Sequence, residues 1–164
     1  MKRDRLIMQI LFGICCISFC FMIFVLYKTA PVNSEYIPPE FDTSAVTGMP
    51  EVSEEYGWSE IYEQGMNYSV GICKKIINID NKAKVYVYNS ENNNVWLRLR
   101  ILDENDEILG QSGLIKPGEY VEDIELSKKI YNEQKIKIKI MSYQKETYYS
   151  EGSITLNTNI QKED

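Results

Sequence analysis

Residues 95–102 read VWLRLRIL, and the alternation of apolar and polar side chains in this stretch decides the fold class. Every second residue is Val, Leu or Ile, so in an extended strand these side chains all point to one side. The other side carries Trp96, Arg98 and Arg100. A strand with one apolar and one polar face is typical of an antiparallel sheet that covers a core on one side only.

The same alternation recurs in residues 135–141, which read KIKIKIM and place Lys135, Lys137 and Lys139 on one side. Polar, Pro or Gly turn residues separate this stretch and the first one from five further apolar runs. These further candidate strands cover residues 70–79, 84–89, 107–111, 120–126 and 152–160. About seven short strands at near-regular spacing predict an all-β fold, an antiparallel Ig-like β-sandwich over residues 65–164.

Cysteine usage limits how this domain can be stabilised. Cys73 is the only cysteine between residues 28 and 164, so no disulfide can form within the domain. The Cys, Trp, Cys set of true immunoglobulin domains is therefore absent, and we expect an Ig-like architecture only. We expect Cys73 to be a buried strand residue, and an intermolecular disulfide is the alternative.

An unbroken apolar run, LIMQILFGICCISFCFMIFVLY, occupies residues 6–27. As a helix it would reach roughly 33 Å, enough to cross a hydrocarbon core of about 30 Å. Lys2, Arg3 and Arg5 precede it, which predicts a cytoplasmic N-terminus and an extracellular C-terminal part in a single-pass cell-membrane protein. We interpret residues 1–27 as a cytoplasmic tip and a signal-anchor helix. A cleaved signal peptide and a lipoprotein anchor on Cys20 are the alternatives.

Residues 28–64 carry eight acidic residues against Lys28, together with four of the five prolines. Their apolar residues show no sustained period, so we predict an acidic linker between membrane and domain. One stretch near its end could be ordered as a short helix, because four apolar residues fall at helical spacing. This candidate docking segment contains Trp58, Ile61, Tyr62 and Met66. It would either pack on its own domain or bind a partner.

One long stretch resembles a known family. It covers residues 85–126 and reads VYVYNSENNNVWLRLRILDENDEILGQSGLIKPGEYVEDIEL. The elements follow one another as strand, Asn-rich loop, long strand, acidic hairpin, SGLI-PGE turn and acidic strand. This order resembles that of a family of small, membrane-anchored, largely uncharacterised surface proteins of Gram-positive bacteria (Firmicutes). The resemblance covers roughly the last 80 residues. It implies a β-sandwich outside the membrane, and it carries over no catalytic residue.

No motif for catalysis, metal binding or nucleotide binding occurs in the chain, which contains no histidine. The acids of residues 103–107 could hold calcium or form a solvated hairpin tip. Glu122, Asp123 and Glu125 could be paired catalytic carboxylates or an exposed acidic strand face. A net charge of −6 gives no support for nucleic-acid binding. We therefore expect that the protein is not an enzyme and binds no cofactor.

Two candidate binding surfaces remain. If strands 95–102 and 135–142 are neighbours, their cations share one outer face, which is either a binding patch or simply a solvated face that protects an edge. These cations are Arg98, Arg100, Lys135, Lys137 and Lys139. The second surface is aromatic and contains Tyr86, Tyr88 and Trp96, residue types that anchor protein interfaces and stack on sugar rings.

The sequence thus predicts a non-enzymatic, membrane-anchored interaction or structural protein of the cell surface. The expected partner is another envelope protein, and the protein would be an accessory component of an envelope assembly. The alternative is a module that binds carbohydrate or an anionic cell-wall polymer.

Overall fold

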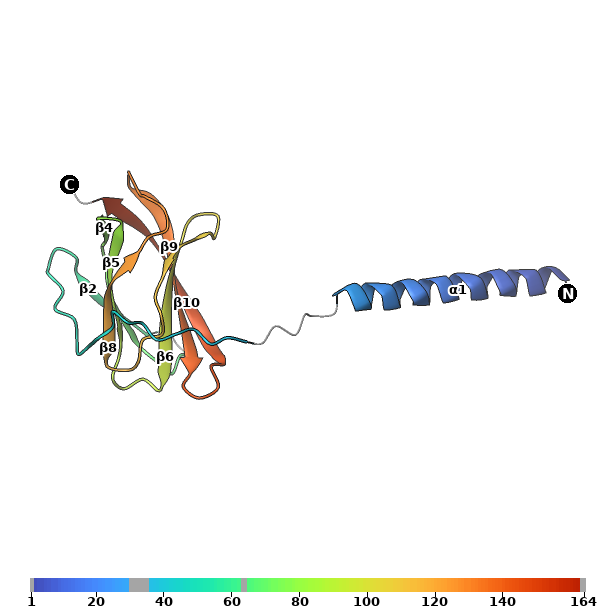
Figure 1. Cartoon of the computed structure of the whole chain (residues 1–164), viewed down its shortest axis with the longest axis horizontal. Helices are drawn as coiled ribbons and strands as arrows, with labels where there is room; N and C mark the ends of the chain where they lie inside the picture. Colours follow the sequence, from blue (N-terminus) through green and yellow to red (C-terminus); the bar gives the residue numbers. More distant parts are fainter. Residues whose placement is uncertain (1, 30–35, 63–64, 163–164) are drawn as a thin grey trace. The chain divides into compact units, whose positions relative to one another are not determined.

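The computed structural model describes residues 2–29, 36–62 and 65–162, which belong to two compact units (Figure 1). The first unit, residues 1–37, contains helix α1 (Lys2–Thr29). The second unit, residues 38–164, contains all the described strands. The chain is therefore mostly β-sheet with one N-terminal apolar helix, as the sequence predicts.

Helix α1 is long and apolar enough between Ile7 and Leu26 to cross a membrane. None of the described side chains in this window is buried against protein. A helix that is apolar all round is normally covered by other helices or by lipid. The predicted apolar helix is confirmed in this sense.

Ten strands are described in the second unit. They are β1 (Val46–Thr47), β2 (Trp58–Ile61), β3 (Val70–Cys73), β4 (Ile76–Ile79), β5 (Lys82–Asn89), β6 (Val95–Leu102), β7 (Ile108–Gln111), β8 (Glu119–Glu125), β9 (Gln134–Gln144) and β10 (Ser150–Lys162). They make one curled mixed sheet in the order β1-β8-β5-β4-β10-β9-β6-β7, with β3 paired to β2 and β5. The pairing of β4 with β10 is parallel, and the other pairings are antiparallel.

This sheet differs from the predicted antiparallel sandwich of about seven strands. The predicted strand 70–79 is two strands, because the chain leaves the ladder at Lys74 and Lys75. The backbone N–H groups of both lysines donate to the Tyr56 carbonyl, at 3.2 and 3.0 Å. The break allows β3 to pair with β2 while β4 pairs with β10. Sequence periodicity cannot show this, because both halves of the run are apolar.

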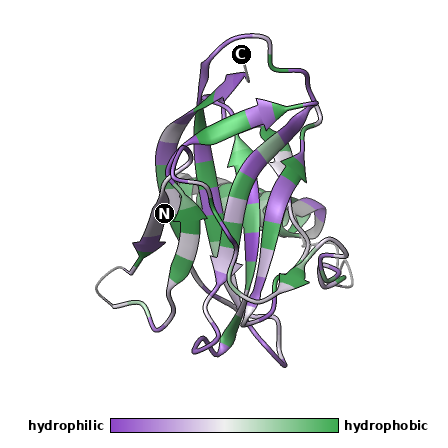
Figure 2. Ribbon diagram, turned by 90° about the vertical axis from the view of Figure 1, so that its left-hand side faces the viewer, coloured by the Kyte–Doolittle hydropathy of each residue, from purple (hydrophilic) through white to green (hydrophobic). Residues whose placement is uncertain are grey.

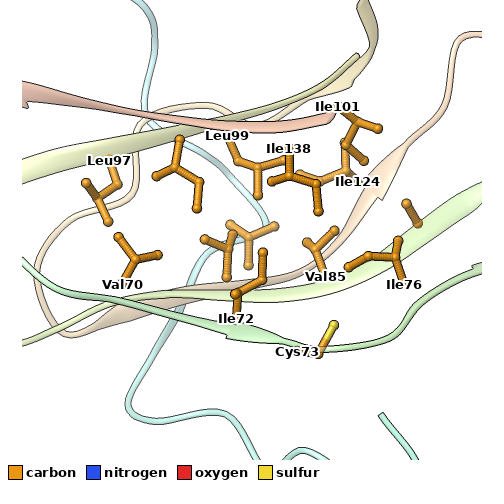
Figure 3. Close-up of a cluster of buried hydrophobic side chains, with 14 of the residues drawn as sticks. Val70, Ile72, Cys73, Ile76, Val85, Leu97, Leu99, Ile101, Ile124 and Ile138 are labelled. Carbon is orange, nitrogen blue, oxygen red and sulfur yellow. The ribbon is translucent and has the colours of Figure 1, made fainter. Parts of the chain in front are cut away.

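The core lies between the two halves of the curled sheet. Side chains from β3 to β5, such as Val70, Ile72 and Val85, point toward Leu97 and Ile138 of β6 and β9 (Figure 3). Apolar and polar residues alternate along the long strands, as the sequence predicts (Figure 2). Each fully buried aliphatic side chain of this kind contributes about 1.5–3 kcal/mol.

The predicted linker 28–64 does not end where the sequence indicates. Residues from Pro38 onward belong to the second unit, although the domain was predicted to begin at residue 65. Phe41 forms a bridge with Leu114, and β1 pairs with β8. These contacts use single apolar residues and backbone groups, which leave no periodic pattern in the sequence.

The predicted helix of the docking segment is wrong, because Trp58–Ile61 forms strand β2 and pairs with β3. The Trp58 ring lies over Gly71, where a Cβ atom would come within 2.2 Å of the ring. Met66 packs against the core, whereas Tyr62 is exposed. Most of this segment is thus used to cover its own domain.

Candidate functional site

The outer side of β6 and β9 gathers the predicted cations. The two strands are neighbours, with Arg98 opposite Met141 and Arg100 opposite Lys139. Alternation along each strand then places every second residue on the same outer side. We call this surface the basic face, and it contains Arg98, Arg100, Lys135, Lys137 and Lys139. Strand β10 extends it with the neutral side chains of Thr155, Asn157 and Asn159, which lie opposite the three lysines.

Little of this positive charge is neutralised within the described part of the chain. Lys137 forms an ion pair with Asp106, with an N–O distance of 2.7 Å. Arg98 Nε donates to the Ser112 carbonyl at 3.0 Å, and Arg100 Nε donates to Gln111 Oε1 at 3.3 Å, both neutral acceptors. These two bonds orient the guanidinium groups and leave their charge available to a partner.

A hollow of about 390 Å³ lies over β9 and β10 on this side. Its floor contains the Ile136 and Thr158 pair of the ladder. Its other lining residues are Glu104, Lys135, Lys137, Asn157 and Asn159. Ammonium, amide and carboxylate groups around one hollow can bind an anionic group and neighbouring hydroxyl groups.

An aromatic cluster adjoins the basic face at Trp96. The ring centroid of Trp96 lies 4.9 Å from that of Phe41 and 4.9 Å from that of Tyr148. Lys116 Nζ lies 4.8 Å from the centre of the Phe41 ring, a cation–π distance. The sequence analysis missed Phe41, because this residue lies in the predicted linker and only tertiary structure brings it to Trp96.

Tyr86 and Tyr88 do not join Trp96 in one surface. They lie on β5, in the other half of the sheet, while their neighbours Val85 and Val87 point into the core. Their side chains therefore lie on the opposite outer side from the basic face. Tyr86 donates its hydroxyl to Glu122 at 3.3 Å, and its ring contacts that of Tyr56.

Two acidic residues of strand β8 form ion pairs with lysines of the neighbouring strand β5. Lys84 Nζ contacts Glu122 at 2.6 Å and Asp123 at 3.3 Å. Burial alone would lower the pKa of Lys84, but its hydrogen bonds to these two carboxylates and their negative charges together outweigh burial and raise that pKa. Burial, reinforced by the charge of Glu122, raises the pKa of Tyr86. These groups form an ion-pair cluster on a strand face, and their carboxylates do not face each other across a cleft.

The acidic hairpin of residues 103–107 is organised by Asp103. One oxygen of its carboxylate, Oδ1, accepts the backbone N–H groups of Asn105 and Glu107, both at 2.9 Å. Lys128 forms an ion pair with Glu107, and Lys137 pairs with Asp106. Local hydrogen bonds and lysines thus contact one carboxylate oxygen each of Asp103, Asp106 and Glu107.

The Asn-rich loop after β5 is a structural element. Asn93 is buried, accepts the backbone N–H of Ser69 at 2.9 Å and donates to the Ser69 carbonyl at 2.6 Å. It also donates to Asn89 Oδ1 at 2.7 Å, and Asn89 donates in turn to the carbonyls of Val95 and Ile115. This network connects four segments and holds the end of β6 that carries Trp96.

No protein family, curated protein or solved structure matches this chain. The resemblance to Gram-positive surface proteins therefore stays a prediction, and a functional assignment depends on the geometry described above.

Proposed function

We propose that the protein is a non-enzymatic, membrane-anchored interaction protein of the cell surface, and that its basic face binds an acidic envelope protein. Helix α1 would be the single anchor, with the N-terminus in the cytoplasm and the Ig-like β unit outside. A Gram-positive cell fits the sequence resemblance. In this role the protein would be an accessory component of an envelope assembly.

One observation carries this proposal. Arg98, Arg100, Lys135 and Lys139 lie on one face and have no carboxylate within ion-pair distance in the described residues. Like charges on neighbouring strands destabilise the free protein, because Arg100 and Lys139 stand directly opposite each other. A partner with negative charge would remove this repulsion and would also associate faster.

A charge-reversal experiment tests the proposal. The chain with Lys135→Glu and Lys139→Glu would be compared with the unmodified chain by cross-linking in intact cells and mass spectrometry of the captured proteins. Lys137 is left in place because it already pairs with Asp106. We expect capture of the partner to fall at least about tenfold, since each interfacial charge reversal costs on the order of 1 kcal/mol or more.

The matched control is Lys74→Glu with Lys75→Glu, which makes the same charge change at two exposed residues between β3 and β4. This control should leave capture unchanged. Equal capture by the basic-face variant and the unmodified chain would overturn the proposal. An equal loss in both variants would show a general effect of net charge and would also reject the basic face as the site.

An anionic wall polymer is the second candidate, and the cluster of Trp96, Phe41 and Tyr148 favours it. Aromatic rings beside cations suit a sugar polymer that carries acidic groups. For this partner, Arg98→Ala with Arg100→Ala should abolish retention of purified wall polymer, and added salt should weaken binding of the unmodified protein. Unchanged retention by the double variant would reject this candidate.

A further inference from the structure

One edge of β10 is unpaired over most of its length. Residues 153–159 pair with β9 on one side, and β4 joins the other side only at residues 160–162. In an antiparallel ladder, alternate residues direct their N–H and C=O groups away from the partner strand. Within the described chain no strand accepts these groups between residues 153 and 159.

The other edges of the described sheet are short, covered or charged. Strand β1 has two residues, and β2 has four, with Glu60 among them. The end of β7 meets the segment after β8, where the Ser127 N–H donates to the Leu109 carbonyl at 2.7 Å. Strand β8 (Glu119–Glu125) pairs with β1 only at its first two residues, and the rest of that edge is acidic. Among the described strands, β10 thus has the longest open edge without charged residues.

The open edge lacks the features that normally prevent strand pairing. Soluble proteins protect long edges with charged residues, proline or bulges. Residues 153–159 read SITLNTN and contain no charge and no proline. The nearest irregularity is the bulge at Ser150–Gly152, which lies just before the open edge begins.

An apolar hollow borders this edge. It has a volume of about 260 Å³ and lies between β10, the β2 and β3 strands, and β9. Its apolar lining includes Ile61, Ile72, Ile138 and Leu156, and Leu156 is only half-buried. A strand paired to β10 would direct every second side chain toward this hollow.

We propose that β10 pairs antiparallel with β10 of a second copy of this chain, centred on Leu156. In that register residue 154 lies opposite 158, and residue 155 lies opposite 157. Ile154 would then meet Thr158 and Leu156 would meet its own copy on the inner side, while Thr155 would meet Asn157 on the outer side. On the outer side polar residues face polar residues, on the inner side Leu156 faces its own copy, and no charges are opposed, so the edge can pair with itself.

A second copy suits this edge because a two-fold pairing uses the same surface of both chains. The two β units would share one continuous sheet, and the half-exposed Leu156 side chains would be covered. This inference depends on backbone pairing at β10 and does not require the basic face to bind anything.

Charge placement on the outer side of β10 tests the pairing. Two full-length copies with different affinity tags would be expressed together, solubilised in detergent and purified through one tag. With Thr155→Lys and Asn157→Lys in both copies, each lysine would oppose a lysine of the partner. We expect recovery of the second tag to fall about tenfold, because two opposed like-charge pairs cost on the order of 1 kcal/mol or more.

A charge-swap mixture separates loss of pairing from loss of folding. One copy would carry Thr155→Lys and Asn157→Lys, and the other Thr155→Glu and Asn157→Glu. Recovery of the second tag should return to the unmodified level, because opposite charges now face each other. Asn92→Lys with Asn132→Lys, at two exposed loop residues, is the matched control and should not change recovery.

Three outcomes would overturn the proposal. The first is that the two unmodified copies do not co-purify. The second is unchanged co-purification of the double-lysine chains, which would place self-association elsewhere, for instance in α1. The third is a charge-swap mixture that is not restored although each chain alone resists protease.

Discussion

At the residue scale, buried polar groups account for parts of the fold that hydrophobic pattern does not predict. Asn93 has 6% of its surface exposed and bonds to both backbone groups of Ser69 and to Asn89. A buried amide with partners on every side specifies one loop geometry, since any other geometry would leave donors and acceptors unsatisfied. The sequence shows an Asn-rich loop but does not show which Asn is buried.

The Asn93 network predicts a large loss of stability in Asn93→Ala. The substitution leaves the Ser69 backbone groups and Asn89 Oδ1 without these partners, at a cost of about 3 kcal/mol. Urea unfolding of residues 38–164 would measure the loss. Asn92→Ala, at an exposed neighbour, should change stability by less than about 0.5 kcal/mol. Similar values for the two variants would show that the network does not stabilise the fold.

Cys73 lies at the end of β3 with 3% of its surface exposed. Burial raises the pKa of its thiol from 9.0 to about 12, although a backbone hydrogen bond acts in the opposite direction. The prediction of a buried strand cysteine is confirmed. An intermolecular disulfide would require the strand to open.

The raised pKa of Cys73 predicts a pH dependence. Between pH 9.0 and about 12 the unfolded chain loses the thiol proton and the folded chain keeps it, so folding stability decreases as pH rises. The slope from this group is about 1.4 kcal/mol per pH unit. Urea unfolding at several pH values should show a shallower decrease in Cys73→Ala than in the unmodified unit. Equal slopes in the two proteins would contradict the prediction.

At the element scale, the sequence predicted the long strands and the short strand β7, but it missed β1 and β2. Strand β6 and the lysine-rich part of β9 follow the alternation in the sequence, and their burial alternates accordingly. Strand β1 has only two residues, and β2 lies in an acidic segment without a sustained apolar period. Trp58 and Ile61 also fit a helix spacing, and pairing with β3 decided between the two structures.

The position of β1 and β2 predicts where the folded unit begins. A chain of residues 38–164 should unfold in one cooperative transition, because Phe41, β1 and β2 remain in place. A chain of residues 65–164 loses the β2 strand that pairs with β3 and should be several kcal/mol less stable or fail to fold. A chain of residues 30–164 is the control. Its free energy of unfolding in urea should equal that of residues 38–164. If residues 65–164 and residues 38–164 had equal free energies of unfolding, the predicted domain start at residue 65 would be correct.

At the scale of the whole molecule, charge and hydropathy separate an apolar helix from a β unit. Helix α1 exposes large apolar side chains such as Phe12 and Ile17. Contact between so much apolar surface and water is energetically unfavourable. The β unit, by contrast, buries its aliphatic residues between two halves of a sheet. This contrast supports the proposed anchor.

The proposed anchor and orientation predict a specific fractionation. The full chain should stay in membranes after an alkaline carbonate wash, and protease added to wall-free cells should remove the β unit while Lys2–Arg5 stays protected. The mass of the purified protein should include α1. A mature protein that begins after residue 29 would show that the helix is a cleaved signal peptide.

The sequence by itself determined the apolar helix, the all-β class and the side of each long strand that faces the core, because these depend on local periodicity and composition. Tertiary structure alone decided that β4 pairs in parallel with β10, that Phe41 reaches Trp96, and that Tyr86 and Trp96 lie on opposite outer sides. It also decided which edge of the sheet stays open. These features depend on which strands become neighbours, and strand neighbours are chosen by contacts between residues far apart in the chain.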